Sequence, residues 1–371
     1  DHVGYSVGLL SQFVQLHKYV FSGSCQGIKC YHTLSHSREE VFGHLLKKQP
    51  LERYGTNYAK QTRCVHRQIR RQPQRSKLTP VENVAAEQPP VRSPGTLLRP
   101  FLFTCTVTGA SFVGSAIWQY EELRNRANHA IGKFENKRND FTSKLGSFRH
   151  HAHVWWQSKS KGQKLIVGIV GLNLLVFGAW KMRALQASML KWFCSSPYGG
   201  APSWSMLLST FSHARGVHLF LNMYVLWSFS VPIITLLGKE QFLAFYLTAG
   251  VVSSFTSYIM KVARVTLVPS IGASGAIMAV IGAVCSHYPD ARLSIAFVDQ
   301  LIPHSFSSGT AVKCLIGFDT LGLLLGWRLF DHAAHLGGIL FGLWYVNYGH
   351  KLIWGKREPV MRLWHQIRSK T

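Results

Sequence analysis

The chain has 371 residues and a formal net charge of +25, yet only 15% of its residues are charged and 47% are aliphatic or aromatic. A soluble protein usually carries roughly 25% charged residues. Nucleic-acid binders are also basic but lack repeated apolar runs, whereas a membrane protein with basic segments beside anionic lipid explains both features. We therefore expect a lipid bilayer, and no nucleic acid, among its partners.

Residues 1–98 are polar and rich in basic side chains. The stretch 60–77 (KQTRCVHRQIRRQPQRSK) has seven Lys or Arg and no acidic residue. A basic, acid-poor N-terminal region is typical of an organelle transit segment. We interpret 1–98 as a largely disordered basic region that contains a mitochondrial transit segment, and a basic tail without a targeting role is the alternative.

Apolar runs begin near residue 100. The first, within 99–120, is uncharged for about 19 residues, close to the ~20 that cross a bilayer as a helix. Residues 121–164 form a charged linker in which Phe134, Phe141 and Phe148 recur every seven positions, as on one face of an amphipathic helix. Six further spans are expected at 165–180, 218–237, 242–260, 270–284, 309–327 and 332–348.

These runs predict an all-α polytopic membrane protein. Backbone polar groups cannot stay unpaired in hydrocarbon, so the runs must be helices rather than open sheet. One extra helix at 99–120 precedes a six-helix core at 165–349, and a basic tail follows at 350–371, where we expect Trp354 and Trp364 to anchor at the interface. Both flanks are basic, so the distribution of positive charge does not decide the orientation.

A small-residue segment, Gly272-Ala273-Ser274-Gly275-Ala276, opens one span. Small residues let membrane helices approach closely, and by itself the segment favours helix packing. The competing interpretation is that Ser274 is a nucleophile.

A histidine-containing segment, residues 331–338, opens the last span. Ionisable groups inside membrane helices are costly and usually mark function. His335 shares a helix face with Gly338 and Gly342, which predicts that it lies at a tightly packed surface. His332 is expected nearer the interface, reaching water or capping the helix.

A third polar pair, His218 and Asn222, shares one face of its span. The pair serves either as a structural hydrogen-bonding unit or as donors to a developing oxyanion. With a serine and a histidine on two other spans, the chain has a nucleophile, a general base and oxyanion donors.

Over residues 165–365, this order of motifs resembles the rhomboid family of intramembrane serine proteases, and its mitochondrial members in particular. The resemblance implies a rhomboid-like six-helix core preceded by one extra transmembrane helix. It also implies roles for eight residues: Ser274 as nucleophile, His335 as general base and acid, Asn222 and His218 at the oxyanion, and Gly272, Gly275, Gly338 and Gly342 as supporting glycines.

Two positions need separate comment. Met278 occupies a place, one turn after the serine, where many family members have an aromatic residue against the catalytic imidazole. Asp319 invites a triad interpretation, but a hydrogen-bonded structural aspartate is the interpretation we favour.

The implied activity is intramembrane endopeptidase cleavage of single-pass membrane proteins, within or near their transmembrane helix. The implied location is the mitochondrial inner membrane, with a role in protein processing and quality control. The seven cysteines show no zinc-type spacing, and no metal or organic cofactor is expected. A rhomboid relative that binds clients without cleaving them, and a channel or transporter, are the alternatives.

Overall fold

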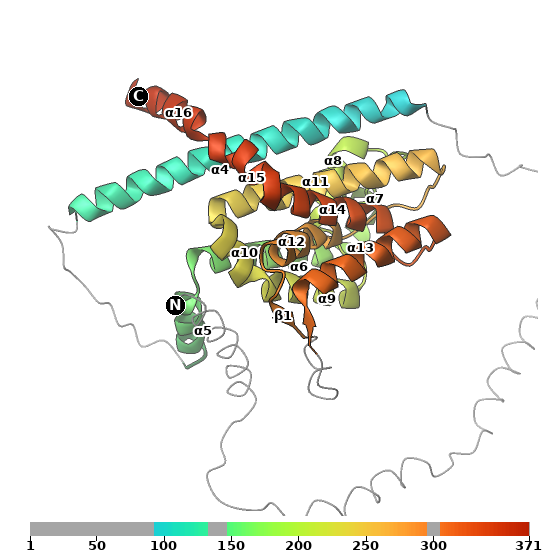
Figure 1. Ribbon diagram of the computed structural model, residues 1–371, viewed down its shortest axis with the longest axis horizontal. Coiled ribbons are helices and arrows are strands. Elements are labelled where there is room, and N and C mark those ends of the chain that lie inside the picture. Colours follow the sequence, from blue (N-terminus) through green and yellow to red (C-terminus); the bar gives the residue numbers. More distant parts are fainter. Residues whose placement is uncertain (1–92, 133–146, 295–304, 371) are drawn as a thin grey trace, which may run out of the picture. The chain divides into compact units, whose positions relative to one another are not determined.

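The computed structural model describes residues 93–132, 147–294 and 305–370, and these are almost entirely helical (Figure 1). The expected helical face through Phe134 and Phe141, and the expected transit segment, lie outside the described residues. The α-helices are α4 (Leu98–Gly132), α5 (Ser147–Ser158), α6 (Lys161–Lys181), α7 (Gln186–Phe193), α8 (Pro202–Leu208), α9 (Gly216–Ser228), α10 (Ser230–Leu237), α11 (Lys239–Ala263), α12 (Ser274–His287), α13 (Ser308–Leu325), α14 (His332–Trp344), α15 (His350–Leu352) and α16 (Glu358–Lys370).

Shorter elements connect these helices. A two-stranded antiparallel sheet joins β1 (Arg292–Leu293) to β2 (Phe306–Ser307) between α12 and α13. The remaining elements are short 3-10 turns, η1 (Pro94–Leu97), η2 (Arg183–Leu185), η3 (Ser209–Phe211) and η5 (Trp354–Lys356), and one π-helical turn, η4 (Tyr345–Gly349).

Each expected span overlaps one or more helices, but the expected count of seven is not confirmed. In the described residues, α4, α6, α11 and α13 are long and apolar enough to cross a bilayer, and α9 with α10 passes as a pair bent by 50°. Helices α12 and α14 have only 14 and 13 residues. Both are shorter than ~20 residues, because the apolar run before Ser274 forms a loop and the helix after Trp344 continues as the π turn η4 and then as α15.

Helix α11 lies at the centre of the core. In the most apolar 18-residue stretch of α11, 67% is buried inside the protein, whereas the same share is 22% in α4 and in α13. Four of its aromatic residues, Phe242, Phe245, Tyr246 and Tyr258, are fully buried. Helices α12 and α14 pack against it and against each other, so the two helices that begin with the predicted site residues are enclosed by the rest of the bundle.

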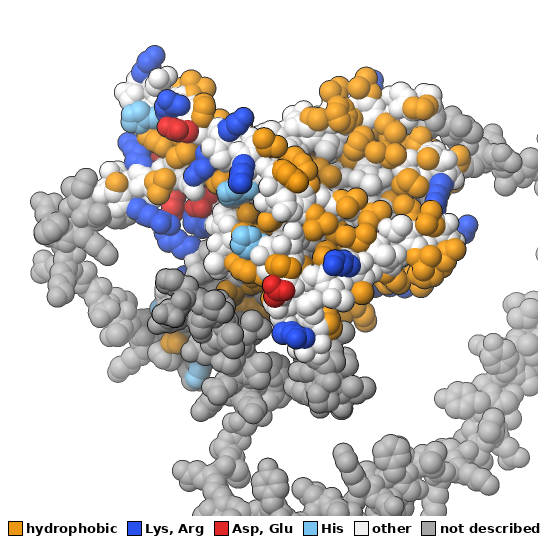
Figure 2. All heavy atoms as spheres, in the orientation of Figure 1, with side chains coloured by type: hydrophobic (Ala, Val, Ile, Leu, Met, Phe, Trp, Pro, Cys, Tyr) orange, Lys and Arg blue, Asp and Glu red, His pale blue; other side chains and the backbone are white. Residues whose placement is uncertain are grey.

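The extra N-terminal helix continues beyond the expected end at residue 120, as far as Gly132. It packs on α11 and on α16. Figure 2 shows hydrophobic side chains over the helical core, while Lys and Arg side chains gather around α16 and the adjacent part of α4. This distribution fits a bundle whose sides face lipid and whose ends reach the aqueous interface.

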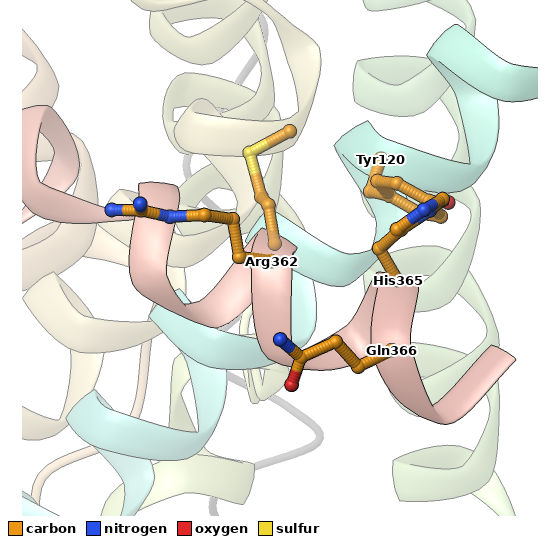
Figure 3. Close-up of a pocket in the computed structure, with 5 residues that line it drawn as sticks. Tyr120, Arg362, His365 and Gln366 are labelled. Atoms are coloured by element: carbon orange, nitrogen blue, oxygen red, sulfur yellow. The ribbon is translucent and has the colours of Figure 1, made fainter. Parts of the chain in front are cut away.

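The C-terminal segment differs from its expected role as a simple tail. Trp354 is only 4% exposed and its ring packs against Phe112 of α4, so it is a core residue rather than an interfacial anchor. Trp364 donates a hydrogen bond from Nε1 to Glu121. A surface pocket between α4 and α16 is lined by Tyr120, Met361, Arg362, His365 and Gln366 (Figure 3). The pocket holds none of the predicted site residues.

Candidate active site

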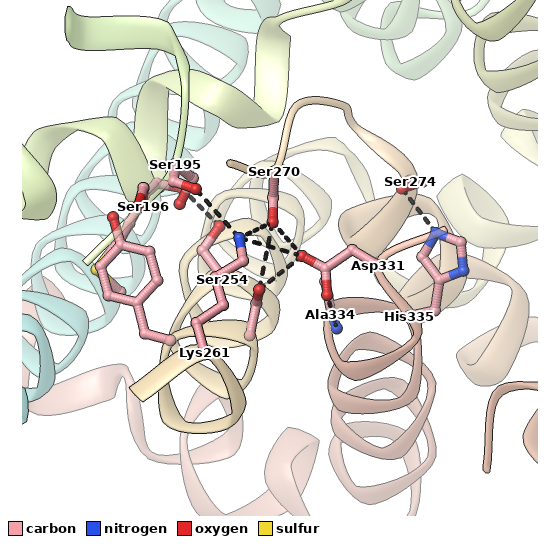
Figure 4. Close-up of polar contacts among 12 residues, drawn as sticks. Ser195, Ser196, Ser254, Lys261, Ser270, Ser274, Asp331, Ala334 and His335 are labelled. Carbon is pink, nitrogen blue, oxygen red and sulfur yellow. Dashed lines mark hydrogen bonds and ion pairs between the residues drawn. The ribbon is translucent and has the colours of Figure 1, made fainter. Parts of the chain in front are cut away.

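A serine and a histidine from two helices meet inside the bundle. Ser274 is the first residue of α12, and His335 lies in the first turn of α14. Ser274 Oγ and His335 Nε2 are 2.9 Å apart (Figure 4), and the imidazole is 7% exposed. At this distance the imidazole can accept the hydroxyl proton, which is the arrangement that activates a serine nucleophile.

The turn before Ser274 depends on a glycine. Gly272 has φ +138°, a conformation that residues with a side chain rarely adopt. A Cβ there would lie 2.7 Å from Cε1 of His218, and the Gly272 N–H donates to the Ser209 carbonyl at 3.2 Å. The turn is therefore held between η3 and α9. It brings the ring of the predicted oxyanion residue His218 against Gly272, which lies two residues before the serine.

Close helix contact aligns the serine with the histidine. A Cβ on Gly338 would lie 2.0 Å from the Gly275 carbonyl oxygen, and one on Gly342 would lie 2.1 Å from that of Ala279. Glycine at these positions lets the two backbones touch, which larger residues would prevent. The Gly275 position is equally tight, since a Cβ there would lie 2.3 Å from Ser253 Oγ of α11.

The imidazole of His335 has an aromatic neighbour from an unexpected position. The ring of Phe330 lies 5.9 Å from it, centroid to centroid, at an interplanar angle of 34°. Met278 packs instead in a small apolar cluster with Cys285, Val312 and Ile339. Phe330, just before α14, thus contacts the His335 ring in place of an aromatic residue at position 278.

The predicted oxyanion residue Asn222 is buried and hydrogen-bonded. Its Nδ2 lies 3.0 Å from Nε2 of His213, a fully buried residue between η3 and α9. Burial, and to a lesser degree His218, lowers the pKa of His213 to about 3. His213 is therefore neutral near pH 7, and its Nε2 accepts a hydrogen bond from one N–H of the Asn222 amide, which leaves the second N–H for another acceptor.

A buried ionic cluster braces the starts of both site helices (Figure 4). Asp331 caps α14 by accepting from the Ala334 N–H at 3.0 Å, and its other oxygen accepts from Ser257 Oγ at 2.6 Å and from Ser270. Lys261 Nζ lies 3.7 Å from that oxygen and donates to the Ser195 carbonyl and to Ser270. The cluster ties α11 and the loop before Ser274 to the helix of His335.

His332 does not reach the interface as expected. It is 3% exposed and its Nδ1 lies 2.7 Å from Oδ1 of Asp319, whose carboxylate is fully buried. The expectation was wrong because the His332 ring packs against the rings of Phe318, Trp327 and Phe330 instead of extending to water. The capping role belongs to Asp331.

Sequence reasoning missed His213 and Lys261 as members of this region. His213 lies five residues before His218, in a loop with no helical period to assign its direction. Lys261 sits at the end of an apolar run, where a lysine ordinarily extends to water. Among the described residues, no group of three or more His, Cys, Asp or Glu is arranged to hold a metal ion.

The apolar helices define a polytopic α-helical membrane protein, and its core encloses a serine and a histidine at hydrogen-bond distance. Comparison with known proteins gives its family: the Rhomboid domain matches residues 201–352, and the chain belongs to the rhomboid family.

Mitochondrial rhomboids are among its relatives. The chain is 48% identical over 285 residues to the mitochondrial presenilin-associated rhomboid-like protein of Rattus norvegicus, covering 76% of this chain and 73% of that protein. It is 32% identical over 210 residues to mitochondrial Rhomboid protein 1 of Saccharomyces cerevisiae, covering 56% and 60% of the two chains. The Rhomboid protease GluP of Bacillus subtilis is 29% identical over 139 residues, covering 38% and 24%.

These relatives confirm the resemblance seen in the motifs. They and the apolar helices identify a multi-pass membrane protein of mitochondria, and the family supports an intramembrane protease role.

Proposed function

We propose that this chain is a serine endopeptidase that cleaves single-pass membrane proteins within or near their transmembrane helix. The observation that carries the proposal is the 2.9 Å contact between Ser274 Oγ and His335 Nε2, each at the start of its own helix. Helices α12 and α14 run in the same direction, since Gly338 lies against Gly275 and Gly342 against Ala279. In this proposal, water reaches the pair from the side on which both helices begin.

The reaction proceeds in two steps. Ser274 Oγ attacks the scissile carbonyl carbon while His335 Nε2 takes its proton, and collapse of the tetrahedral intermediate breaks the C–N bond as His335 protonates the leaving amine. Water then attacks the acyl ester while His335 takes one of its protons. The second tetrahedral intermediate collapses with cleavage of the C–Oγ bond, His335 returns the proton to Ser274 Oγ, and the carboxylic acid product leaves.

Three donors stabilise the oxyanion in this proposal: the free amide proton of Asn222, the ring of His218 and the backbone N–H of Ser274. The last belongs to the first turn of a helix, where N–H groups have no partner within the helix and the helix dipole favours negative charge. Substrates with helix-weakening residues near the scissile bond suit this site, because an intact helix hides its peptide carbonyls.

Mitochondrial inner-membrane proteins are the proposed substrate class, and processing and quality control the proposed role. We further propose residues 165–349 as the protease core, 99–120 as the extra span, and 1–98 as carrying the transit segment. No cofactor takes part in this mechanism.

The test is cleavage of a single-pass membrane substrate in liposomes by the wild type, Ser274→Ala and His335→Ala. Ser228→Ala, which removes an exposed hydroxyl of α9, is the matched control. We expect the wild type and the control to cut, and both site variants to stay folded and lose cleavage. A folded wild type that binds the substrate without cutting would contradict the proposal and favour a client-binding relative.

A further inference from the structure

One buried carboxylate lies between the two histidines of α14. Asp319, on α13, is fully buried. Its Oδ1 is 2.7 Å from Nδ1 of His332 and 3.3 Å from Nδ1 of His335. The second distance places Asp319 on the side of the catalytic imidazole opposite Ser274.

We propose that Asp319 is a positioning residue for His335, and that His332 holds its carboxylate in place. The inference rests on the proposed protease function. It extends the serine–histidine pair to a chain of four residues, Ser274, His335, Asp319 and His332, drawn from α12, α13 and α14.

The contacts specify which nitrogens carry protons. A carboxylate only accepts hydrogen bonds, so an imidazole nitrogen facing it is protonated. With its proton on Nδ1, His335 has Nε2 free to accept from Ser274, which is the tautomer that a general base needs. The same rule puts the His332 proton on Nδ1, and among the described residues His332 Nε2 has no hydrogen-bond partner.

Burying this carboxylate away from water costs free energy, which indicates that the fold keeps it for a function. Ionised carboxylates are seldom fully buried without hydrogen bonds, and Asp319 Oδ2 has no partner in the described part of the chain. Gly322, one turn along α13, leaves the space for His332, since a Cβ there would lie 2.5 Å from its ring. The fold therefore makes room for a histidine whose polar contact is this aspartate.

The two distances indicate how the carboxylate works during the reaction. Before the reaction it is hydrogen-bonded to His332, and the 3.3 Å separation from His335 is long for an N–H···O bond. When His335 takes the Ser274 proton it becomes cationic, and its attraction to the fully buried carboxylate shortens that separation. Stabilising the imidazolium in this way lowers the barrier without tightening substrate binding.

The first test compares Asp319→Asn with Asp290→Asn, which removes an exposed carboxylate of the α12–β1 loop. The readouts are the rate at which a fluorophosphonate labels Ser274, kcat and KM for a cleaved substrate, and thermal unfolding. An asparagine amide can donate to Nδ1 and so favour the wrong tautomer. We expect labelling and kcat to fall roughly 10²-fold with KM unchanged, less than the ~10⁴-fold loss for the acid of a close Ser-His-Asp triad.

The second test separates positioning from folding. His332→Asn keeps a donor near the place of Nδ1, whereas His332→Ala removes it. We expect His332→Asn to retain most of the labelling rate and His332→Ala to lower it about 10-fold, at temperatures where both variants are folded. This pair decides the question if Asp319→Asn does not fold.

The outcomes are distinguishable from failure of the proposed function. The role of Asp319 is overturned if the wild type is labelled at Ser274 and cuts its substrate, and if folded Asp319→Asn is labelled and cuts at the same rate. Equal labelling by the two His332 variants overturns the role of His332. A wild type that neither labels nor cuts contradicts the protease proposal itself.

Discussion

At the scale of single residues, burial changes what ordinary side chains do in this protein. Asn222 is enclosed beside a histidine that burial keeps neutral, and His335 meets a serine at hydrogen-bond distance. Losing the partner of a buried donor or acceptor costs about 1–3 kcal/mol, so the groups that contact Asn222 and His335 matter for stability as well as for chemistry. The residue-scale predictions concern these partners.

Replacing Asn222 with alanine tests the oxyanion role. We expect kcat to fall by about 10²-fold with little change in KM, because a donor to the oxyanion acts mainly in the transition state. The matched control is Asn347→Ala, which removes an exposed amide of η4. Steady-state cleavage kinetics decide it, and an unchanged kcat would remove Asn222 from that role.

Acidification should destabilise the fold through His213. The pKa of this histidine is about 3 in the folded protein against an ordinary value of 6.5, so between these values the unfolded chain binds the extra proton. Stability from this group is then full above pH 6.5 and falls by at most about 1.4 kcal/mol per pH unit below it.

The His213 prediction is measured by thermal unfolding between pH 7.5 and 5. His213→Gln keeps an acceptor for the Asn222 amide but does not titrate, and we expect its unfolding temperature to decline less steeply with acidification. Parallel curves for the wild type and the variant would contradict the assignment.

At the scale of elements, the site depends on how closely α12 and α14 pack. Helix contact at this range needs glycine on α14, because Gly338 and Gly342 lie against the α12 backbone and lack room for a Cβ. The N-cap Asp331 joins the same contact to Lys261 of α11. Element packing, more than any single bond, therefore sets the distance from Ser274 to His335.

Gly342→Ala should separate the two helices. Its Cβ would lie 2.1 Å from the Ala279 carbonyl oxygen, and we expect a loss of about 1–3 kcal/mol of stability together with reduced cleavage. Gly317→Ala on α13 is the control, because nothing lies within 4 Å of the added methyl group. Alanine there should stabilise the helix slightly. Similar unfolding temperatures for both variants would refute the packing argument.

At the scale of the whole molecule, the extra helix α4 is joined to the core by a small ionic network. Glu122 of α4 pairs with Lys161 at the start of α6, and it lies 3.5 Å from Lys239 at the start of α11. Lys239 also lies over the Trp118 ring at 4.3 Å. The network links α4 to the starts of α6 and α11, which are far apart in the sequence.

Removing the Glu122 charge should loosen α4 from the core. We expect Glu122→Gln to cost about 1 kcal/mol and to speed proteolysis near the C-terminal part of α4, since its two lysine partners lose their shared carboxylate. Glu358→Gln, in an exposed pair with Arg362 at 3.9 Å, is the control and should change neither quantity. Equal effects from the two variants would show that the network does not hold α4.

The class of this protein follows from its sequence alone. Runs of uncharged apolar residues can satisfy their backbone only as membrane helices. Within those runs, His335, His218 and Asn222 indicated a function or a structural hydrogen bond, whereas the segment around Ser274 by itself favoured helix packing. These signals are local, and the family comparison confirmed the resemblance drawn from them.

The tertiary structure decided what lies beside those residues. The inward turn of His332, the approach of Asp319 to both histidines, the burial of Trp354 and the use of Phe330 against His335 all join segments distant in the sequence or turn a side chain in a loop. No helical period predicts such contacts, because they are set by which helix faces meet. The helices follow from the order of the residues, whereas the site follows from packing between α12, α13 and α14.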